Sequence, residues 1–451
     1  MQDLFSGLII GLLGLVLLLL TVSRYTDRER PLLLLAYLAH VVAGFAQVLI
    51  TVNLYGSGDI FGYARRGEEL SAALSIDFQG MGWELLKLLF HQDAMLPITI
   101  TGIGSSTGSM TAIAGFVAYF TGGSVYAGCV LLGVAGFFAK LLTYEVFRLS
   151  CPQRLHRRLL VANILVPSVV FWSSGLLKES VAMVGLGPMT LGVYRLLHRR
   201  PLVGLVMLGL GAVTIGLVKA YILFAFVIAA AAWLYTARAW KDGIPRVRPI
   251  HLAVGFVVAM GGVTLLGRLF PEYSVDSFSE QAAYHQEVGQ RVRGGSTYEL
   301  VSPGDASASV QLMFAPLALL TSLYRPLLFE VNSAQVAVNA METSALLGVT
   351  IWLLWRCTLR ELWSTLLNSP TAVFSLIFTG VMGVAVGLTT TNLGTLSRYR
   401  APLVPYFASL LVILASAVQK ARASEQTRPG SSLRPGSSLP PSMSTLESNI
   451  K

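Results

Sequence analysis

The chain has 451 residues, of which 54% are hydrophobic and only 12% charged, and its formal net charge is +10. A soluble chain carries about 25% charged residues, so this composition excludes an ordinary soluble domain. Apolar runs of roughly 20 residues, the length that crosses a bilayer, recur along the chain. The positive charge suits basic cytoplasmic loops and requires no nucleic-acid partner. Cys129, Cys151 and Cys357 are scattered and odd in number, which indicates neither a disulfide framework nor a metal site.

The composition and the repeated apolar runs predict an all-α fold, a polytopic transmembrane helix bundle of roughly 11 to 13 spans. The first run, 5–23, has no basic residue before it and no small-x-small cleavage site, so we expect a retained helix. The expected spans are 5–23, 31–54, 97–121, 124–147, 159–177, 180–196, 201–218, 220–237, 251–269, 336–355, 371–390 and 401–419.

Basic residues in the short connections assign these spans to sides of the membrane. From residue 159 onward, connections rich in Lys and Arg alternate with connections that are not. This alternation is expected if all of the basic connections lie on the cytoplasmic side. The N-terminal part does not alternate in this way, because two full spans across 97–147 would separate Arg28 from Arg154. One segment is re-entrant, or the chain crosses once more near 80–96, or the first loop departs from the charge rule. We favour a re-entrant segment at 101–110, which is rich in Gly, Ser and Thr.

Two regions on the outer side are too long to be turns. In the first, 55–96, leucines alternate with charges over 67–90, which predicts amphipathic helices on the membrane surface. In the second, 270–335, a polar stretch precedes an apolar segment that we expect to be re-entrant or interfacial. Residues 1–420 are predicted to form one transmembrane domain of catalytic type. The Ser- and Pro-rich tail, 421–451, is predicted to be a disordered cytoplasmic segment.

The 31–54 span is followed by Tyr-Gly-Ser-Gly-Asp59 and then by Tyr63, which places a carboxylate and an aromatic ring at the membrane surface. An enzyme that handles a lipid-linked substrate needs an acid or base at this boundary. Asp beside Gly is also ordinary turn chemistry, so a helix-end turn is the alternative.

Lys178 and Glu179 follow a Trp-Ser-Ser-Gly string at a position where apolar sequence is expected. Ionisable residues at membrane depth are candidate functional residues. The alternative is that Lys178 reaches the interface and Glu179 faces water. Lys219 lies in a hairpin so short that it is predicted at the outer surface, where it contacts phosphate or simply reaches the interface.

The last outer loop carries Arg398, Tyr399 and Arg400, and arginines on this side run against the positive-inside trend. Guanidinium groups bind phosphate with two hydrogen bonds, so both arginines are candidates for holding a lipid phosphate or pyrophosphate. The alternative is an interfacial anchor for the last helix. Arg325 and Glu330 offer a further pair, either in substrate binding or as an internal ion pair.

Taken together, these strings resemble a family of bacterial polytopic membrane proteins of surface-polysaccharide synthesis, and are distantly similar to GT-C glycosyltransferases and O-antigen-type polymerases. The carrying residues are Asp59 with Tyr63, the 167–179 string, Arg325 with Glu330, and the 398–405 string. The resemblance implies that Asp59 acts as base or metal partner and that Arg398 and Arg400 contact polyprenyl phosphate. No Asp-Asp or Asp-Glu pair follows Asp59 in its loop, so the sequence indicates no metal site and leaves the need for a divalent metal open.

The function expected from these residues is a membrane glycosyltransferase or polysaccharide polymerase at the outer face of a bacterial inner membrane. Asp59 or Glu179 would act as the base. Tyr63, Lys178, Lys219, Arg325, Glu330, Arg398, Tyr399 and Arg400 would bind a polyprenyl-phosphate-linked saccharide. The expected partners are the lipid bilayer, this substrate and polysaccharide assembly proteins. The alternatives are a transporter or flippase of lipid-linked saccharides and a non-catalytic subunit of an assembly complex.

Overall fold

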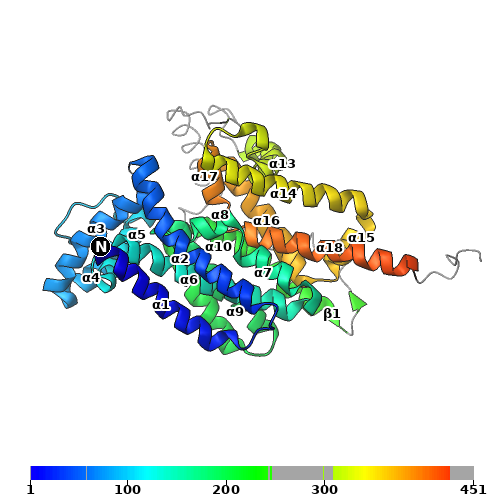
Figure 1. The fold of residues 1–451 in the computed structure, drawn as a ribbon, viewed down its shortest axis with the longest axis horizontal. Coiled ribbons are helices and arrows are strands. Elements are labelled where there is room, and N and C mark those ends of the chain that lie inside the picture. Colours follow the sequence, from blue (N-terminus) through cyan, green and yellow to red (C-terminus); the bar gives the residue numbers. More distant parts are fainter. Residues whose placement is uncertain (1, 57, 242–243, 246–297, 299–307, 427–451) are drawn as a thin grey trace, which may run out of the picture.

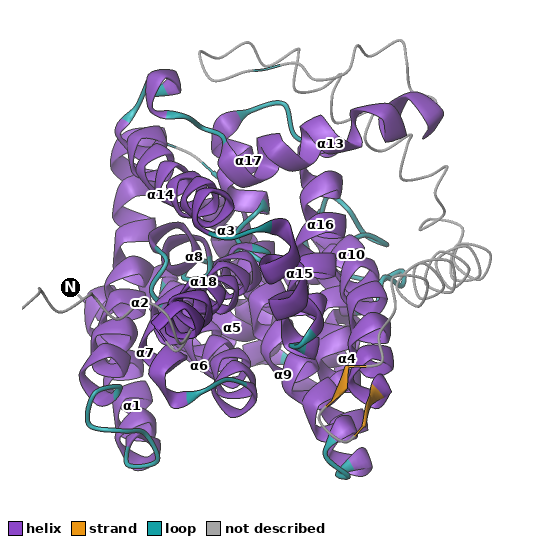
Figure 2. Cartoon of the chain, turned by 90° about the vertical axis from the view of Figure 1, so that its right-hand side faces the viewer, coloured by secondary structure: helices purple, strands orange, loops and turns teal. Residues whose placement is uncertain are grey.

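The computed structural model describes residues 2–56, 58–241, 244–245, 298 and 308–426. In this part of the chain the fold is an all-α helix bundle, with one pair of two-residue strands near residue 240 (Figures 1 and 2). The α-helices of the first half are α1 (Gln2–Val22), α2 (Arg30–Ile50), α3 (Asp59–Ile76), α4 (Phe78–Leu89), α5 (Ser106–Thr121), α6 (Val125–Ser150), α7 (His156–Ile164), α8 (Pro167–Trp172), α9 (Lys178–Leu197) and α10 (Pro201–Ala239). Those of the second half are α13 (Ala308–Tyr324), α14 (Ala334–Arg356), α15 (Leu359–Leu367), α16 (Pro370–Thr389), α17 (Leu393–Tyr399) and α18 (Val404–Gln426). The short elements are η1 (Thr51–Tyr55), η2 (Gln153–Leu155), η4 (Leu328–Glu330), β1 (Trp240–Lys241) and β2 (Ile244–Pro245).

Seven helices of the described residues are long and apolar enough to cross a membrane, or up to eight if a bent pair counts as one span. The chain is therefore a multi-pass helical membrane protein, as its composition predicts. The expected span 251–269 and most of the tail, 427–451, lie outside the described residues. Helix α18 continues to Gln426, past the expected start of the tail at 421.

The N-terminal helices remove the conflict between spans and basic loops. Helices α1 and α2 are antiparallel, since Gly7 packs against Phe45 and Gly14 against Tyr37. Helix α6 begins beside the start of α1, where the Ser124 hydroxyl donates to the Asp3 carbonyl (2.9 Å). Arg148, near the other end of α6, lies beside Glu29 in the loop that precedes α2. The loop that carries Arg28 and the loop that carries Arg154 are therefore at the same end of the bundle.

Helix α5 begins and ends at the opposite end. Its first residues contact Lys178, and Ser124, just after its last turn, contacts Asp3. The predicted span 97–121 therefore does not carry the chain from one end of the bundle to the other. With α3 and α4, α5 forms a side lobe around a small core of Leu70, Leu74, Leu85 and Leu88, at the left of Figure 1. A Cβ on Gly67 would meet the Ala114 carbonyl at 2.7 Å, so this glycine lets α3 and α5 approach.

Helix α10 reverses direction at Lys219, whose backbone angles (φ −153°, ψ 67°) are not helical. Gly204 packs against Gly192 of α9, and further along the chain Gly211 packs against Gly185, so the first half is antiparallel to α9. The second half returns along α16. Two spans are thus joined at Lys219 by the short hairpin that the sequence predicts.

One predicted span contains a break in its helix, and another begins at a sharp bend. The span expected at 159–177 consists of α7 and α8 followed by non-helical 173–177. The span expected at 401–419 contains most of α18, which makes an angle of 72° with α17. Non-helical backbone at membrane depth occurs where it is buried in protein or lines a cavity. Both breaks lie beside the polar residues described below.

Helix α13 is antiparallel to α16, since Gly387 packs against Ala318 and Gly383 against Ser322. After a cis Arg325–Pro326 bond the chain turns back towards the start of α14. The Thr343 hydroxyl of α14 donates to the Pro326 carbonyl (2.6 Å) and fixes this turn. The apolar segment before Arg325 is thus a helix of 17 residues, shorter than the candidate spans of the bundle.

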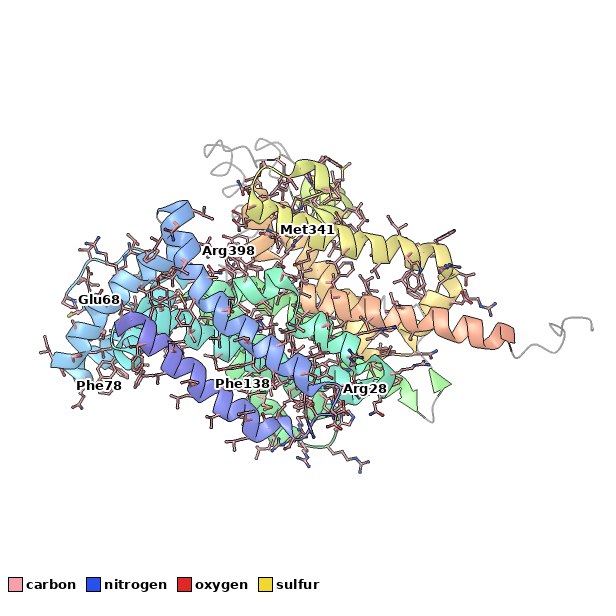
Figure 3. All side chains as sticks on the ribbon, in the orientation of Figure 1. Arg28, Glu68, Phe78, Phe138, Met341 and Arg398 are labelled. Carbon is pink, nitrogen blue, oxygen red and sulfur yellow. The ribbon has the colours of Figure 1, made fainter. Side chains whose placement is uncertain are left out.

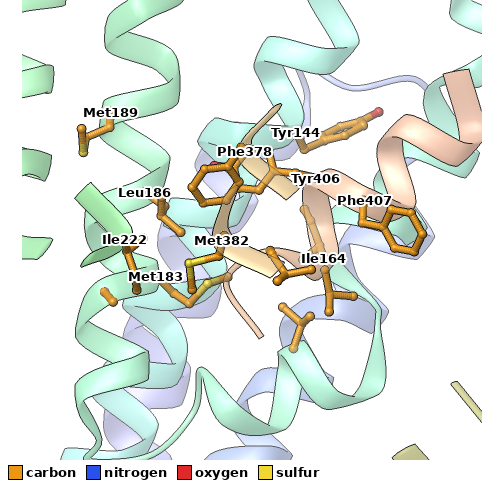
Figure 4. Packing of buried hydrophobic residues seen from close by; sticks show 14 of the residues in the cluster. Tyr144, Ile164, Met183, Leu186, Met189, Ile222, Phe378, Met382, Tyr406 and Phe407 are labelled. Atoms are coloured by element: carbon orange, nitrogen blue, oxygen red, sulfur yellow. The ribbon is translucent and has the colours of Figure 1, made fainter. Parts of the chain in front are cut away.

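The main core fills the space between α6, α9, α10, α16 and α18 (Figure 4). Its aromatic centre is formed by Phe226, Phe374, Phe378 and Tyr406, with ring centroids 4.8–6.2 Å apart. Edge-to-face pairs of this kind add to the gain from burial. The Tyr406 hydroxyl is satisfied by Thr190 (2.7 Å), so the polar atom carries no burial penalty.

Candidate functional site

Five charged residues from four segments meet at the end of the bundle that carries the side lobe. We call them the polar cluster: Asp59, Lys178, Glu179, Lys219 and Arg398. Figure 3 labels Arg398 between the side lobe and α14. Sequence reasoning selected all five from stretches far apart in the chain, and the fold brings them together.

Glu179 is the centre of the polar cluster. One carboxylate oxygen lies 2.7 Å from Lys219 Nζ and the other 2.9 Å from Arg398 Nη2. Arg398 Nη1 also donates to Asp59 Oδ2 (2.7 Å). Exposure rises along this chain of contacts, from 1% for the Glu179 side chain through 20% for Arg398 to 54% for Asp59. The cluster therefore reaches the surface at Asp59.

The break between α8 and α9 places Glu179 at this depth. The Ser173 and Ser174 hydroxyls both donate to the Val170 carbonyl (3.3 and 2.7 Å), which satisfies an acceptor at the end of α8. Gly175 packs closely against Gln47 of α2. Helix α9 can then begin at Lys178, with Glu179 in its first turn, where the helix dipole favours an acidic residue.

The first turns of three helices bear residues of the polar cluster or its partners. Asp59 begins α3, Ser106 begins α5 and Lys178 begins α9. The Lys178 ammonium donates to Ser106 Oγ (3.0 Å) and Thr107 Oγ1 (2.9 Å). It forms no ion pair within 4 Å with a carboxylate of the described residues. Helix N-termini carry unpaired N–H groups and partial positive charge, so this arrangement suits an anion.

Aromatic rings hold the cations in place. Lys219 Nζ lies 3.8 Å from the centre of the Tyr399 ring and donates to the Tyr221 hydroxyl (3.2 Å). The Arg398 guanidinium lies 5.9 Å from the centre of the Trp172 ring, a weaker cation–π contact. Tyr63 is buried one turn after Asp59, and burial together with the Asp59 charge raises the pKa of its hydroxyl.

Arg400, Arg325 and Glu330 lie in a second group of contacts, which we call the arginine network together with Glu342. Arg400 Nη1 donates to the Arg325 carbonyl (2.7 Å), and its Nη2 lies 3.8 Å from Glu342. Arg325 Nε donates to Glu330 (2.8 Å). Its guanidinium lies over the Tyr298 ring, 4.5 Å from the centre. These residues join the turn after α13 to the end of α17, and no hydrogen bond or ion pair among the described residues links them to the polar cluster.

Sequence reasoning did not select Ser106, Thr107, Trp172 or Tyr221 as site residues. The available signals were the Gly-, Ser- and Thr-rich stretch at 101–110 and the Trp-Ser-Ser-Gly string. Glu342 also gains a definite place, since it accepts hydrogen bonds from the Ser168 N–H (2.9 Å) and hydroxyl (2.7 Å) at the start of α8.

The described residues contain no group of three or more His, Cys, Asp or Glu side chains placed to hold a metal ion. The two carboxylates of the polar cluster share Arg398, and their geometry is that of ion pairs. The fold and the site together define a multi-pass membrane protein with a cluster of three cations and two carboxylates at the end opposite its basic loops. Comparison with protein-family models, curated proteins and solved structures finds no match.

Proposed function

We propose that this chain is a membrane glycosyltransferase or polysaccharide polymerase of a bacterial inner membrane, working at the outer face on a polyprenyl-(pyro)phosphate-linked saccharide. The observation that carries the proposal is Lys178. Its ammonium has only hydroxyl partners among the described residues, and it lies where helices α5 and α9 begin. A cation held in this way is available for a phosphate oxygen, whereas Lys219 is already paired with Glu179.

The cations favour a phosphate, and the carboxylates keep the cations in place. Arg398 and Lys219 are fixed by Glu179, which is too buried to meet a sugar hydroxyl. Glu179 therefore acts as a positioning residue in this proposal. Arg398, Lys178 and the first N–H groups of α5 and α9 would face the donor phosphate.

Asp59 is the carboxylate that substrate can reach. It would take the proton from an acceptor hydroxyl while the acceptor oxygen attacks the anomeric carbon of the donor sugar. The bond from that carbon to the phosphate oxygen breaks, and its electron pair leaves with the phosphate. Arg398 and Lys178 would stabilise the negative charge that develops on the leaving oxygen. The contact of Arg398 with Asp59 (2.7 Å) keeps the base beside the leaving group.

The test uses the purified full chain in detergent with polyprenyl diphosphate as the binding probe and a panel of polyprenyl-diphosphate-linked saccharides as donors. Lys178→Met is expected to weaken binding of the probe about 10- to 100-fold, the usual value of a hydrogen bond to a charged group. Lys87→Met, on the surface of α4, is the matched control. Wild-type affinity in Lys178→Met would contradict the phosphate assignment.

The rate of sugar transfer tests separately whether Asp59 is the base. Asp59→Asn is expected to lower the rate of transfer about 10²- to 10⁴-fold with little change in affinity for the probe. Asp93→Asn, an exposed carboxylate of the same region, is the control. If Asp59→Asn transfers sugar at the wild-type rate, Asp59 is not the base.

A transporter of lipid-linked saccharides is the second candidate, because two ionisable residues lie in the bundle interior. Lys140 and His40 are both buried, and the Lys140 ammonium contacts the Ser173 hydroxyl. Charged groups inside spans often belong to transport paths. Lys140→Met should leave glycosyl transfer in detergent intact if the chain is the enzyme. Loss of lipid-linked saccharide movement across proteoliposomes, with no transfer activity in the wild type, would favour the transporter.

A further inference from the structure

A cavity of about 510 Å³ lies at the basic end of the bundle, opposite the polar cluster. It is formed by the loop between α1 and α2 and by the segment between α6 and α7. Arg28, Arg154 and Arg157 line it, and all three are exposed. Figure 3 labels Arg28 at the end of the bundle away from Glu68 and Phe78.

The three arginines are not neutralised by the protein. Within the described residues, their side chains form no ion pair or hydrogen bond with another side chain. The neighbouring Arg30 and Arg148 differ, since Arg30 pairs with Asp27 (2.8 Å) and Arg148 with Glu145 (3.2 Å). A cavity with three free guanidinium groups attracts an anion with several oxygens.

The two acidic residues of the cavity wall do not cancel this charge. Asp27 is paired with Arg30, which lies outside the wall. Glu29 accepts hydrogen bonds from the Thr26 N–H (2.9 Å), the Thr26 hydroxyl (2.6 Å) and the Tyr144 hydroxyl. Burial raises the pKa of Glu29, but these hydrogen bonds outweigh burial and hold the pKa below its ordinary value. Glu29 is therefore ionised, and its carboxylate oxygens are occupied by hydrogen bonds. These bonds connect the loop before α2 to Tyr144 of α6.

The apolar surface beside the cavity indicates what carries the anion. The last turns of α1 expose Leu13, Leu17 and Leu20, which lie on one face of the helix, and Leu20 is 73% exposed. This face leads to the loop that carries Arg28. Basic loops define the cytoplasmic side of a membrane protein, and basic pockets on that side bind the headgroups of anionic lipids.

We propose that this cavity binds the phosphate group of an anionic phospholipid from the cytoplasmic leaflet, with its acyl chains along the exposed face of α1. Arg28, Arg154 and Arg157 hold the phosphate. The site is independent of the polar cluster, which lies at the other end, and it does not require the proposed glycosyl transfer.

The experiment is native mass spectrometry of the purified full chain in a neutral detergent. The probes are dioleoyl phosphatidylglycerol, dioleoyl phosphatidylcholine with the same acyl chains, and inorganic phosphate. The test variant carries Arg28→Gln, Arg154→Gln and Arg157→Gln. The control variant carries Arg158→Gln, Arg199→Gln and Arg200→Gln, which removes the same charge from the same end but outside the cavity.

Wild type and control are expected to retain phosphatidylglycerol in preference to phosphatidylcholine, and the test variant to bind it about 100-fold more weakly. Equal loss in the control variant, or equal binding of both lipids, overturns the proposal. Binding of inorganic phosphate that phosphatidylglycerol does not displace assigns the cavity to a free anion and overturns the lipid assignment. If the triple variant does not fold, the three single variants are measured, and wild-type affinity in all of them overturns the proposal.

Discussion

Arg398 and Arg400 are separated by one residue, yet their side chains belong to two different regions. Arg398 bridges Glu179 and the half-exposed Asp59, while Arg400 is 1% exposed and donates to the Arg325 carbonyl. The polar cluster around Arg398 comes from four segments and leaves Lys178 without a carboxylate partner among the described residues. The residues around Arg400 join the turn after α13 to α17. The two regions therefore differ in kind: the polar cluster reaches the surface at Asp59, and the arginine network holds the turn after α13 against the end of α17.

The strongest test of this comparison is Glu179→Gln. The amide leaves Lys219 and Arg398 in the interior without their shared countercharge, and breaking a buried ion pair in this way costs about 3–5 kcal/mol. The free energy of unfolding, measured in detergent by chemical denaturation, should fall by that amount. Asp59→Asn is the matched variant, because its carboxylate is half exposed, and it should cost about 0–1 kcal/mol. Equal stability of the two variants would show that Glu179 does not hold the cluster together.

The two arginines can then be compared directly. Arg400→Met loses a hydrogen bond from a charged donor in the interior, so the free energy of unfolding should fall by about 1.5–3 kcal/mol. Its affinity for polyprenyl diphosphate should stay within twofold of wild type. Arg398→Met should bind the same probe at least 10-fold more weakly, for the loss of one charged hydrogen bond. A variant of Arg400 that folds normally but binds weakly would place both arginines in the site and end the distinction.

The smallest expected effect is the pH dependence of stability that Glu330 contributes as a structural residue. Burial raises the pKa of Glu330, but hydrogen bonds from Arg325 and the Leu327 N–H (2.8 Å) outweigh it and hold the pKa below its ordinary value. The lowered pKa means that the contribution of Glu330 to stability is present above the unfolded-state pKa of about 4.3. It is lost as the pH falls through the folded-state pKa.

The Arg325–Glu330 ion pair is partly exposed, so its contribution to stability is small. The free energy of unfolding of wild type should exceed that of Glu330→Gln at neutral pH, and acidification should reduce this difference by about 1 kcal/mol. Unfolding measured at several pH values checks this, with Glu68→Gln, an exposed carboxylate, as the reference. A difference that does not change with pH would mean that Glu330 contributes packing rather than charge.

Much of the fold could be predicted from the sequence, because a bilayer demands runs of apolar residues of fixed length. The helix bundle and the hairpin at Lys219 follow from run lengths and from the sides that basic residues take. The side of Asp59 could not be settled in this way, because an apolar run of 16 residues such as α5 can cross a membrane or stop short. The contacts of Ser124 with Asp3 and of Lys178 with Ser106 show only the end of the bundle at which Asp59 lies, opposite the loops of Arg28 and Arg154.

The residues of the polar cluster could also be selected from the sequence, since charges are rare in this chain and each lies beside a predicted break or turn. Which charges share a site could not be selected, and Arg398 and Arg400 looked equivalent. Side chains two residues apart in a helix are separated by roughly 200° around its axis, so they point to opposite sides. The direction of each depends on which helices pack around α17, and that information lies in segments up to 339 residues away.

By itself the sequence determined that this protein lies in a membrane, which end of it is basic and which few charged residues are available for chemistry, because these properties depend on composition and local order. Only the tertiary structure decided that Asp59, Lys178, Glu179, Lys219 and Arg398 form one cluster while Arg325, Glu330 and Arg400 form another. The physical reason is that an ion pair forms between atoms a few ångströms apart, and helix packing alone brings such distant segments to that separation.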